Sequence, residues 1–353
     1  MAVKYGAFNN KSRTSYMKIL IVTVEHIKKE ERYKDDKGWS FGRAFDRLGM
    51  ETRFFFYKKK GPLAFLEKKK YLKDIWRNYM NRQLLDCVKK SKPDILLAIT
   101  GNTIEPETLW EIRKKTDTIL VNVFTDNPFI FMNKFKSIEA YHYFFVKDTY
   151  ILSTLKKAAL NNVFYLPQCT NPEIHRPMTL AGGDESVYST DVALIGSMYP
   201  YRAKAIEQLI EFEPAIWGRG WSNSSNPEVK RRYKGKDIRG TQKAKAISGA
   251  AISLNLHHPL NDINGTGSRT FDIAACRGFQ LADHKSDIEK LLKIGEEIIC
   301  FESMDQLKKL IPYYLKHTDE RKQIAEAAYQ RVIKEHTYDV RAKQIIEIVS
   351  DRR

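Results

Sequence analysis

Two glycines, two hydroxyl residues and an arginine lie together in NGTGSRTFDIAACRGF, residues 264–279. Gly265 and Gly267 carry no Cβ, so their backbone can approach a ligand closely, and Ser268 is a good N-cap for the apolar helix expected after it. The N–H groups of a first helical turn, the helix dipole and the Arg269 guanidinium together attract a phosphate or diphosphate. This stretch is therefore a candidate anion site.

A capped turn alone would also explain the Gly-Thr-Gly-Ser sequence, with Asp272 complementing the helix dipole. A second glycine-serine pair, Gly196 and Ser197, ends the apolar run DVALIGS, and Arg202 follows closely. If both runs are strands of one parallel sheet, the two loops lie at the same sheet edge. The pairing of two such loops favours the anion site over a purely structural turn.

The elements that must position these loops alternate along the chain. From Met17 short runs rich in β-branched residues alternate with segments of helical period, which indicates parallel β-α-β units. The expected strands are KILIVTV, ETRFFFY, DILLAIT, TILVNVF, YHYFFV and NVFYLPQ, followed by DVALIGS, PAIWG, AAISLNL, FQLAD and EEIICF. The predicted fold class is α/β, with two Rossmann-like domains and a cleft between the carboxyl ends of their sheets.

A segment rich in Pro, Gly, Ser and Thr interrupts this alternation between residues 171 and 190 and is expected to be the linker. We expect an N-terminal tail at 1–16, a first domain at 17–170 and a second at 191–335. A final helix is expected at 336–353.

The composition of the chain indicates a globular protein of more than one domain that attracts anionic partners. The chain has 353 residues, 42% of them hydrophobic, which is more than one compact core usually holds. A formal net charge of +17 predicts attraction to polyanions, anionic lipid or phosphorylated ligands. Its four scattered cysteines disfavour zinc and disulfides, and with no signal or membrane-spanning run in the sequence a cytoplasmic location is expected.

Several segments, in order and spacing, resemble the CgeB-like members of the GT-B glycosyltransferases. They are FTDNPF, VFYLPQCTNPEIHRP, DVALIGSMYPYR, IWGRGW, ISLNLHHP, CRGFQLAD, GEEIICF and HTYDVRAKQII, within residues 90–350. The resemblance implies an acceptor-binding first domain, a nucleotide-sugar-binding second domain and a C-terminal helix that crosses back to brace the first. It implies no cofactor, the nucleotide-diphosphate sugar being a co-substrate.

The resemblance also implies residue roles. In the wider group two glutamates with seven residues between them bracket this loop, and here the bracket falls on Asn264 and Asp272. Asp272 would accept hydrogen bonds from the ribose, whereas Asn264 replaces the acid that holds the transferred sugar and brings no charge. The remaining donor-binding candidates are Gly196, Ser197, Asn255, His257, Gly265, Thr266, Gly267, Ser268 and Thr270.

Breaking a sugar–phosphate bond develops negative charge on the leaving diphosphate, and Arg202 and Arg269 are the candidate groups to stabilise it. No Asp-x-Asp pair suggests a Mg²⁺ site, so metal independence is expected. Asp126 in FTDNPF is a candidate base or acceptor-orienting group, although an Asx turn before Pro128 explains it equally well.

The sequence offers fewer candidate residues for binding the acceptor than for binding the donor. His26 and Trp39 are candidate acceptor-binding residues, and the acceptor is expected to be a glycan, a lipid-linked glycan or a protein. Basic stretches with aromatics, YKKKGPLAFLEKKKYLKDIWR and EVKRRYKGKDIRG, fit a peripheral contact with an anionic membrane better than nucleic acid. The alternatives left open are a nucleotide-sugar 2-epimerase, a phosphorylase, or a non-catalytic nucleotide-sugar or nucleic-acid binding protein.

Overall fold

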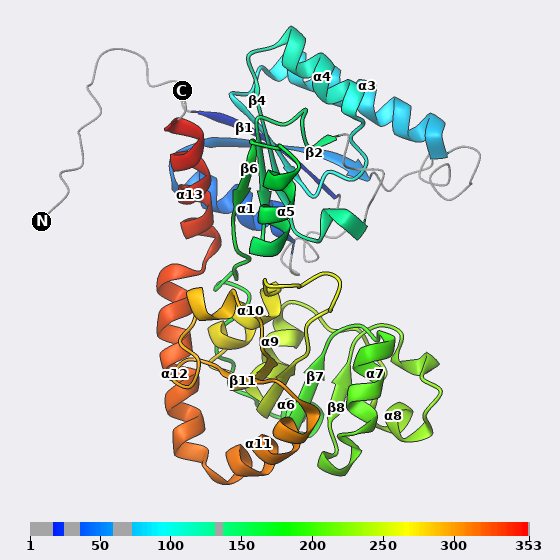
Figure 1. The fold of residues 1–353 in the computed structure, drawn as a ribbon, viewed down its shortest axis with the longest axis vertical. Helices are drawn as coiled ribbons and strands as arrows, with labels where there is room; N and C mark the ends of the chain where they lie inside the picture. Colours follow the sequence, from blue (N-terminus) through cyan, green and yellow to red (C-terminus); the bar gives the residue numbers. More distant parts are fainter. Residues whose placement is uncertain (1–16, 25–35, 59–72, 131–136, 352–353) are drawn as a thin grey trace, which may run out of the picture.

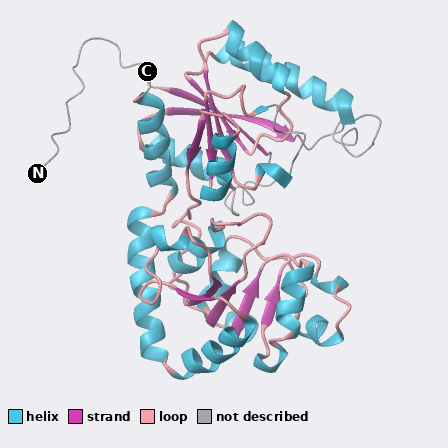
Figure 2. Cartoon of the chain, in the orientation of Figure 1, coloured by secondary structure: helices cyan, strands magenta, loops and turns pink. Residues whose placement is uncertain are grey.

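Two α/β lobes, one above the other, make up the computed structural model, which describes residues 17–24, 36–58, 73–130 and 137–351 (Figure 1). Each lobe is built on one sheet, and every pair of neighbouring strands is parallel. The two sheets lie at the centres of their lobes with helices around them (Figure 2). The predicted fold class is confirmed.

The N-terminal lobe contains a six-stranded sheet of order β2-β1-β3-β4-β5-β6. All six predicted strands are present: β1 (Lys18–Val24), β2 (Glu51–Lys58), β3 (Ile95–Ile99), β4 (Ile119–Phe124), β5 (Tyr143–Val146) and β6 (Val163–Tyr165). The helices of this lobe are α1 (Lys37–Arg47), α3 (Lys73–Ser91), α4 (Pro106–Lys115), the 3₁₀ turn η3 (Pro128–Ile130) and α5 (Thr149–Lys157).

The C-terminal lobe contains a five-stranded sheet of order β11-β10-β9-β7-β8. Its strands are β7 (Thr190–Ile195), β8 (Ala215–Trp217), β9 (Ala250–Asn255), β10 (Gln280–Asp283) and β11 (Ile299–Phe301), so all five predicted strands are again present. Its α-helices are α6 (Gly183–Tyr188), α7 (Pro200–Glu207), α8 (Pro227–Arg232), α9 (Thr241–Ser248), α10 (Ser268–Ala275), α11 (Met304–Lys316) and α12 (Thr318–Glu335). The 3₁₀ turns are η5 (Ile210–Phe212), η6 (Trp221–Asn223) and η7 (Ile288–Lys290).

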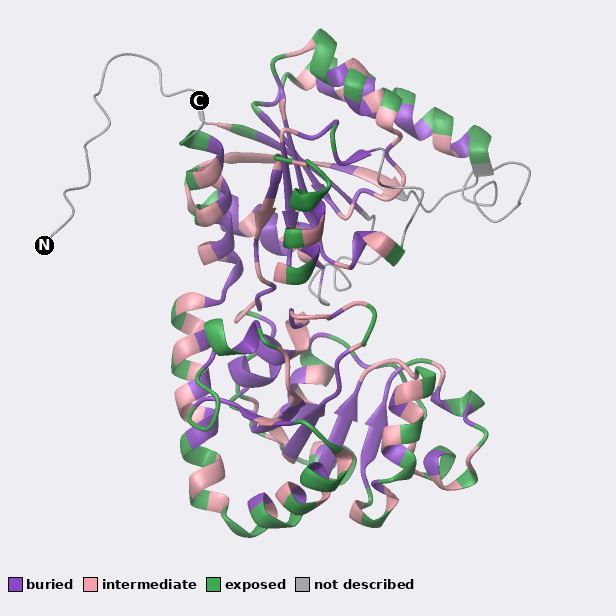
Figure 3. Ribbon diagram, in the orientation of Figure 1, coloured by how far each residue is buried: buried purple, intermediate pink, exposed green. Residues whose placement is uncertain are grey.

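Helices on both faces of each sheet explain the unbroken apolar runs. All five residues of β3 are buried, which is expected of a parallel strand covered on two sides. In the N-terminal lobe α3, α4 and α5 pack on one face and α1 on the other. Figure 3 shows the buried strands in purple and the exposed outer helix surfaces in green. The sheets therefore form rigid platforms, and the loops at their edges carry the polar chemistry.

The last helix, α13 (Tyr338–Ser350), leaves the C-terminal lobe and lies against the N-terminal lobe, as predicted (Figure 1). Tyr338, Ala342, Ile345 and Val349 belong to the same apolar cluster as β1, β3 and α1. Helix α12 remains with the C-terminal lobe, and the chain changes direction at His336. None of the helices in the described ranges is both long enough and apolar enough to cross a membrane.

The segment predicted to be a linker is partly ordered by contacts. Helix α6 forms within it, and Asp184 receives a hydrogen bond from Lys245 of α9 at 2.7 Å. Tyr188 at the end of α6 is buried beside Trp217. The sequence contains no apolar period here because a single buried aromatic is enough to anchor so short a helix.

Candidate functional site

The strand order of the C-terminal sheet reverses between β7 and β9, and ligands in open parallel sheets bind at the carboxyl ends of such strands. A cavity of about 230 Å³ lies there. Five of the eleven predicted donor-binding positions line this cavity, together with both candidate arginines. The lining residues are Ser197, Tyr199, Arg202, Asn255, Leu256, His257, His258, Asn261, Asp262, Gly267, Ser268 and Arg269.

Two guanidinium groups lie side by side in this cavity. Arg202 is only 3% exposed and donates hydrogen bonds to the carbonyls of Ser197 at 2.5 Å and Leu256 at 2.6 Å. Arg269 shares the Leu256 carbonyl at 3.2 Å. A Cβ built on Gly196 would overlap the Arg269 guanidinium and lie 3.1 Å from Arg202 Nη1. Glycine at this position therefore leaves the space that the two arginines occupy.

No carboxylate among the described residues forms an ion pair with either arginine, and Arg202 Nε is buried without an acceptor. Burial first, and then the charge of Arg202, lower the pKa of Arg269 from 12.5 to about 10. Burial likewise lowers the pKa of Arg202. Two adjacent cations, one buried and one partly buried, that form no ion pair with a carboxylate create a preference for an anion.

Helix α10 adds backbone donors to this preference. It begins at Ser268, and the N-cap is Gly267, so the prediction that Ser268 caps the helix was wrong. The amides of Ser268 and Arg269 have no acceptor within the described part of the chain, as expected for a first turn. They lie in the cavity wall beside the two guanidinium groups. The arrangement can bind a phosphate or diphosphate.

The amides just before this helix have a different partner. Asp148, which is fully buried and begins α5 of the N-terminal lobe, accepts hydrogen bonds from the amides of Ile263, Asn264 and Gly265 at 2.8–3.0 Å. A Cβ on Gly265 would lie 2.7 Å from the Lys147 carbonyl oxygen. Gly265 was predicted to let a ligand approach, but here it lets the other lobe approach.

The threonines of the loop are held from behind by a buried network. His257 Nδ1 lies 2.9 Å from Asp283, and its Nε2 lies 2.6 Å from the Thr266 hydroxyl. Thr266 also contacts the Thr270 hydroxyl, which accepts from Asn255 at 2.8 Å. Burial opposes ionisation of Asp283, but hydrogen bonds from His257 outweigh it and hold its pKa at about 2. This network holds the loop in place, and the hydroxyls of Thr266 and Thr270 form their hydrogen bonds within it.

Asp272, the predicted ribose acceptor, is engaged within the protein. Its carboxylate accepts from Thr170 and Lys243, each at 2.7 Å, and lies 3.0 Å from His175 Nδ1. It is 3% exposed. Asp272 therefore joins α10 to the segment between the lobes, and it also lines a second cavity of about 160 Å³ that shares Ser268 with the first.

The predicted site residues of the N-terminal lobe lie after β4 and in α1. Asp126 is partly exposed after β4, and its neighbour Asn127 donates to the Leu260 carbonyl and accepts from the Phe129 amide. The Asx turn expected here therefore forms on Asn127, which leaves the Asp126 carboxylate outside that turn. Trp39 stacks on Phe54 with ring centroids 4.2 Å apart. His26 lies outside the described residues.

Sequence reasoning missed the inter-lobe residues Lys147, Asp148 and Asp262. Lys147 and Asp262, 2% and 6% exposed, form a salt bridge between the lobes. The available signal was KDT directly after an apolar strand, since Asp in that position is a common N-cap. Within the described residues no group of three or more His, Cys, Asp or Glu side chains could hold a metal ion.

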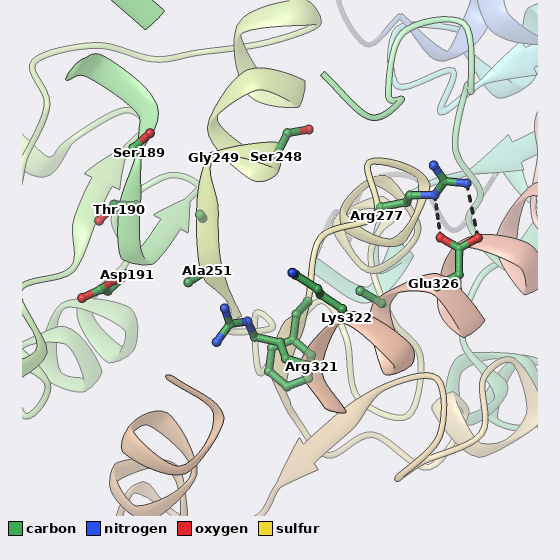
Figure 4. Close-up of a pocket in the computed structure, with 13 residues that line it drawn as sticks. Ser189, Thr190, Asp191, Ser248, Gly249, Ala251, Arg277, Arg321, Lys322 and Glu326 are labelled. Carbon is green, nitrogen blue, oxygen red and sulfur yellow. Dashed lines mark hydrogen bonds and ion pairs between the residues drawn. The ribbon is translucent and has the colours of Figure 1, made fainter. Parts of the chain in front are cut away.

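A larger cavity of about 970 Å³ lies at the opposite, amino ends of β7 and β9 (Figure 4). Two of its cationic side chains, Arg277 and Arg321, form hydrogen bonds within the protein. Arg277 pairs with Glu326 at 2.7 Å, and Arg321 donates to the last carbonyls of α11. Arg277 is therefore neutralised by a carboxylate, whereas Arg202 and Arg269 at the carboxyl ends form no such ion pair in the described chain.

Known proteins resemble the chain at three levels. Residues 202–347 match a family model described as glycosyl transferase-like. Over 269 residues the chain is 23% identical to the spore protein CgeB of Bacillus subtilis, covering 71% of this chain and 81% of that protein. Sucrose-phosphate synthase from Thermosynechococcus elongatus superposes with a TM-score of 0.67 at 12% identity, covering 95% and 99% of the two chains. Anabaena HepE, solved with UDP and glucose, superposes with a TM-score of 0.63 at 12% identity, covering 95% and 100%.

Proposed function

We propose that this chain is a CgeB-like GT-B glycosyltransferase, which moves a sugar from a nucleotide-diphosphate sugar to an acceptor hydroxyl without a divalent metal. The observation that carries the donor assignment is the pair of adjacent guanidinium groups, Arg202 and Arg269, which form no ion pair with a carboxylate in the described chain. A diphosphate supplies the missing negative charge.

The charge pair also suits the chemistry of the step. When the sugar–phosphate bond breaks, negative charge grows on the leaving diphosphate, and fixed cations in a desolvated cavity stabilise it most at that moment. The amides of Ser268 and Arg269 add donors that do not need to reorganise. These groups would neutralise the leaving group in the role that a metal ion plays elsewhere.

Asp126 is the proposed acceptor-side group. It follows β4 in the N-terminal lobe, and its neighbour Asn127 is tied to Leu260 and Asn261 of the donor loop at 2.7 Å each. These bonds hold the carboxyl end of β4 against the lobe that would carry the sugar. A carboxylate there could accept the proton of an incoming hydroxyl. Most of the basic segment at 57–77, predicted to contact an anionic acceptor or membrane, lies outside the described residues, which omit 59–72.

The test is a calorimetric and thermal-shift series with UDP, GDP, ADP and their sugars. A ligand at 100 times its Kd is expected to add about 2.7 kcal/mol of stability. If pyrophosphate alone binds and no nucleotide does, the cavity is an anion site without a donor role. Turnover of the bound nucleotide sugar in the absence of any acceptor would instead favour the epimerase alternative.

A further inference from the structure

We propose that Asp262, with Asn261 beside it, forms the subsite that binds the hydroxyl groups of the donor's sugar. The inference rests on the proposed function, because it assigns the part of the same cavity that the diphosphate does not fill. It concerns which sugars are accepted, a property that the arginine pair does not determine.

The wall of the cavity divides by charge. Arg202, Arg269 and the first turn of α10 provide its positive part. Asp262 is the one carboxylate among the described residues that line it. Since the sugar is bonded directly to the diphosphate, it must lie within one ring's reach of the arginines. Of the other polar lining residues, Asn255 and His257 are engaged in the buried network. We assign the sugar to the part of the wall formed by Asn261 and Asp262 with His258.

The Asp262 carboxylate has the hydrogen-bonding capacity that this role requires. One oxygen accepts from Lys147 Nζ and the other accepts from the His258 amide at 3.1 Å. Each carboxylate oxygen can accept two hydrogen bonds, so one position on each remains for a hydroxyl donor. Two acceptors on one planar group match two neighbouring hydroxyls of a sugar ring.

Lys147 explains how an acid can be placed so close to a diphosphate. An isolated carboxylate would repel the phosphates, whereas an acid neutralised by a buried lysine retains its acceptor geometry with little net charge. Burial raises the pKa of Asp262, but the charges of Lys147 and His257, with the hydrogen bonds from Lys147 and the His258 amide, together lower it. Lys147 belongs to the N-terminal lobe, so the sugar subsite is complete only while the lobes are in contact.

A matched control exists at the same inter-lobe contact. Asp287 is also a buried carboxylate of the C-terminal lobe, and it accepts from the Thr149 amide at 2.9 Å and from the Thr149 hydroxyl at 2.6 Å. It does not line the cavity. Replacing Asp287 by Asn therefore weakens the same contact between the lobes without touching the proposed subsite.

The experiment compares Asp262→Asn and Asp287→Asn by calorimetry with UDP and with UDP-glucose, UDP-galactose and UDP-N-acetylglucosamine. We expect Asp262→Asn to weaken the best UDP-sugar about tenfold while the Kd for UDP changes less than about twofold, since only the sugar loses a charged acceptor. Asp287→Asn is expected to leave the ratio of the two Kd values unchanged. If both variants change that ratio equally, or Asp262→Asn weakens UDP as much as the UDP-sugar, the subsite assignment is wrong.

Two further arms separate the causes of failure. If the wild-type protein binds UDP but no UDP-sugar more tightly than UDP, the subsite fails while the diphosphate site stands. If it binds no nucleotide diphosphate and no nucleotide sugar of the UDP, GDP and ADP series, the proposed function fails with it. Should Asp262→Asn lose its fold because Lys147 is left unpaired, the double variant Lys147→Met/Asp262→Asn removes both charges, and the same ratio of Kd values decides the question.

Discussion

Replacing Arg269 by Met should make the unliganded protein more stable while it weakens donor binding. Arg269 lies beside Arg202 in a largely desolvated cavity, and neither has a carboxylate partner among the described residues. Its one hydrogen-bond acceptor, the Leu256 carbonyl, remains bonded to Arg202 at 2.6 Å in the variant. The substitution therefore removes a repulsion and leaves no buried carbonyl unsatisfied.

The pKa of Arg269 gives the size of the effect. A fall from 12.5 to about 10 corresponds to roughly 3 kcal/mol that disfavours the charged group in the folded state. Solvent at the mouth of the cavity screens part of this cost, so we expect a gain of about 1 to 3 kcal/mol in the free energy of unfolding. Loss of a charged donor should weaken UDP binding about 10- to 100-fold.

Urea unfolding at low and high salt measures the first quantity, and calorimetry with UDP measures the second. Arg269→Lys is the matched control, since it keeps the charge and should not gain stability. The gain for Arg269→Met should shrink at high salt, because mobile ions screen the pair in the wild type. A loss of stability in Arg269→Met that is independent of salt would show that the arginine is structural and that the unneutralised pair does not exist in solution.

Three other substitutions probe the surrounding framework. Gly196→Ala places a methyl group where the two guanidinium groups lie, so calorimetry should find UDP binding weakened at least about tenfold while circular dichroism is unchanged. Burial and the charge of Arg341 lower the pKa of His336 from 6.5 to about 4, so the unfolded state binds more protons between these values and stability should fall by about 2 kcal/mol from pH 7 to pH 5. His336→Gln, which cannot protonate, should remove most of that slope in urea titrations, and an unchanged slope would exclude His336 as its source. Asp148→Asn weakens three hydrogen bonds between the lobes, so urea unfolding should show about 1 to 3 kcal/mol less stability. An unchanged free energy of unfolding would mean that these hydrogen bonds do not stabilise the protein.

The two sheets could be predicted from sequence because a parallel strand covered on both faces requires an apolar run, and each predicted run is a strand. The arginine pair could also be predicted from sequence. Arg202 follows the Gly196-Ser197 pair at the end of β7, and Arg269 follows the Gly267-Ser268 pair at the start of α10. These signals are local: they depend on the residue types within one loop. Local patterns indicate which edge of a sheet carries polar chemistry.

The partners of Gly265 and Asp272 could not be predicted in the same way. Both residues fit a ligand-binding role by type and position, yet Gly265 contacts Asp148 and Asp272 contacts Lys243. Carboxylates and phosphates both accept hydrogen bonds from backbone amides. The sequence NGTG therefore fits equally well whether its amides bind a diphosphate or a carboxylate from another part of the chain. Only the packing of one lobe on the other distinguishes the two.

Helix α13 makes the N-terminal lobe dependent on residues that are synthesised after the whole of the other lobe. Its side chains complete the apolar layer on one face of the first sheet, beside β1, β3 and α1. A nascent chain emerging from the ribosome therefore carries that face uncovered until residues 338–350 emerge. A chain truncated before α13 therefore exposes apolar surface on the first sheet, which is the kind of surface that chaperones and proteases recognise.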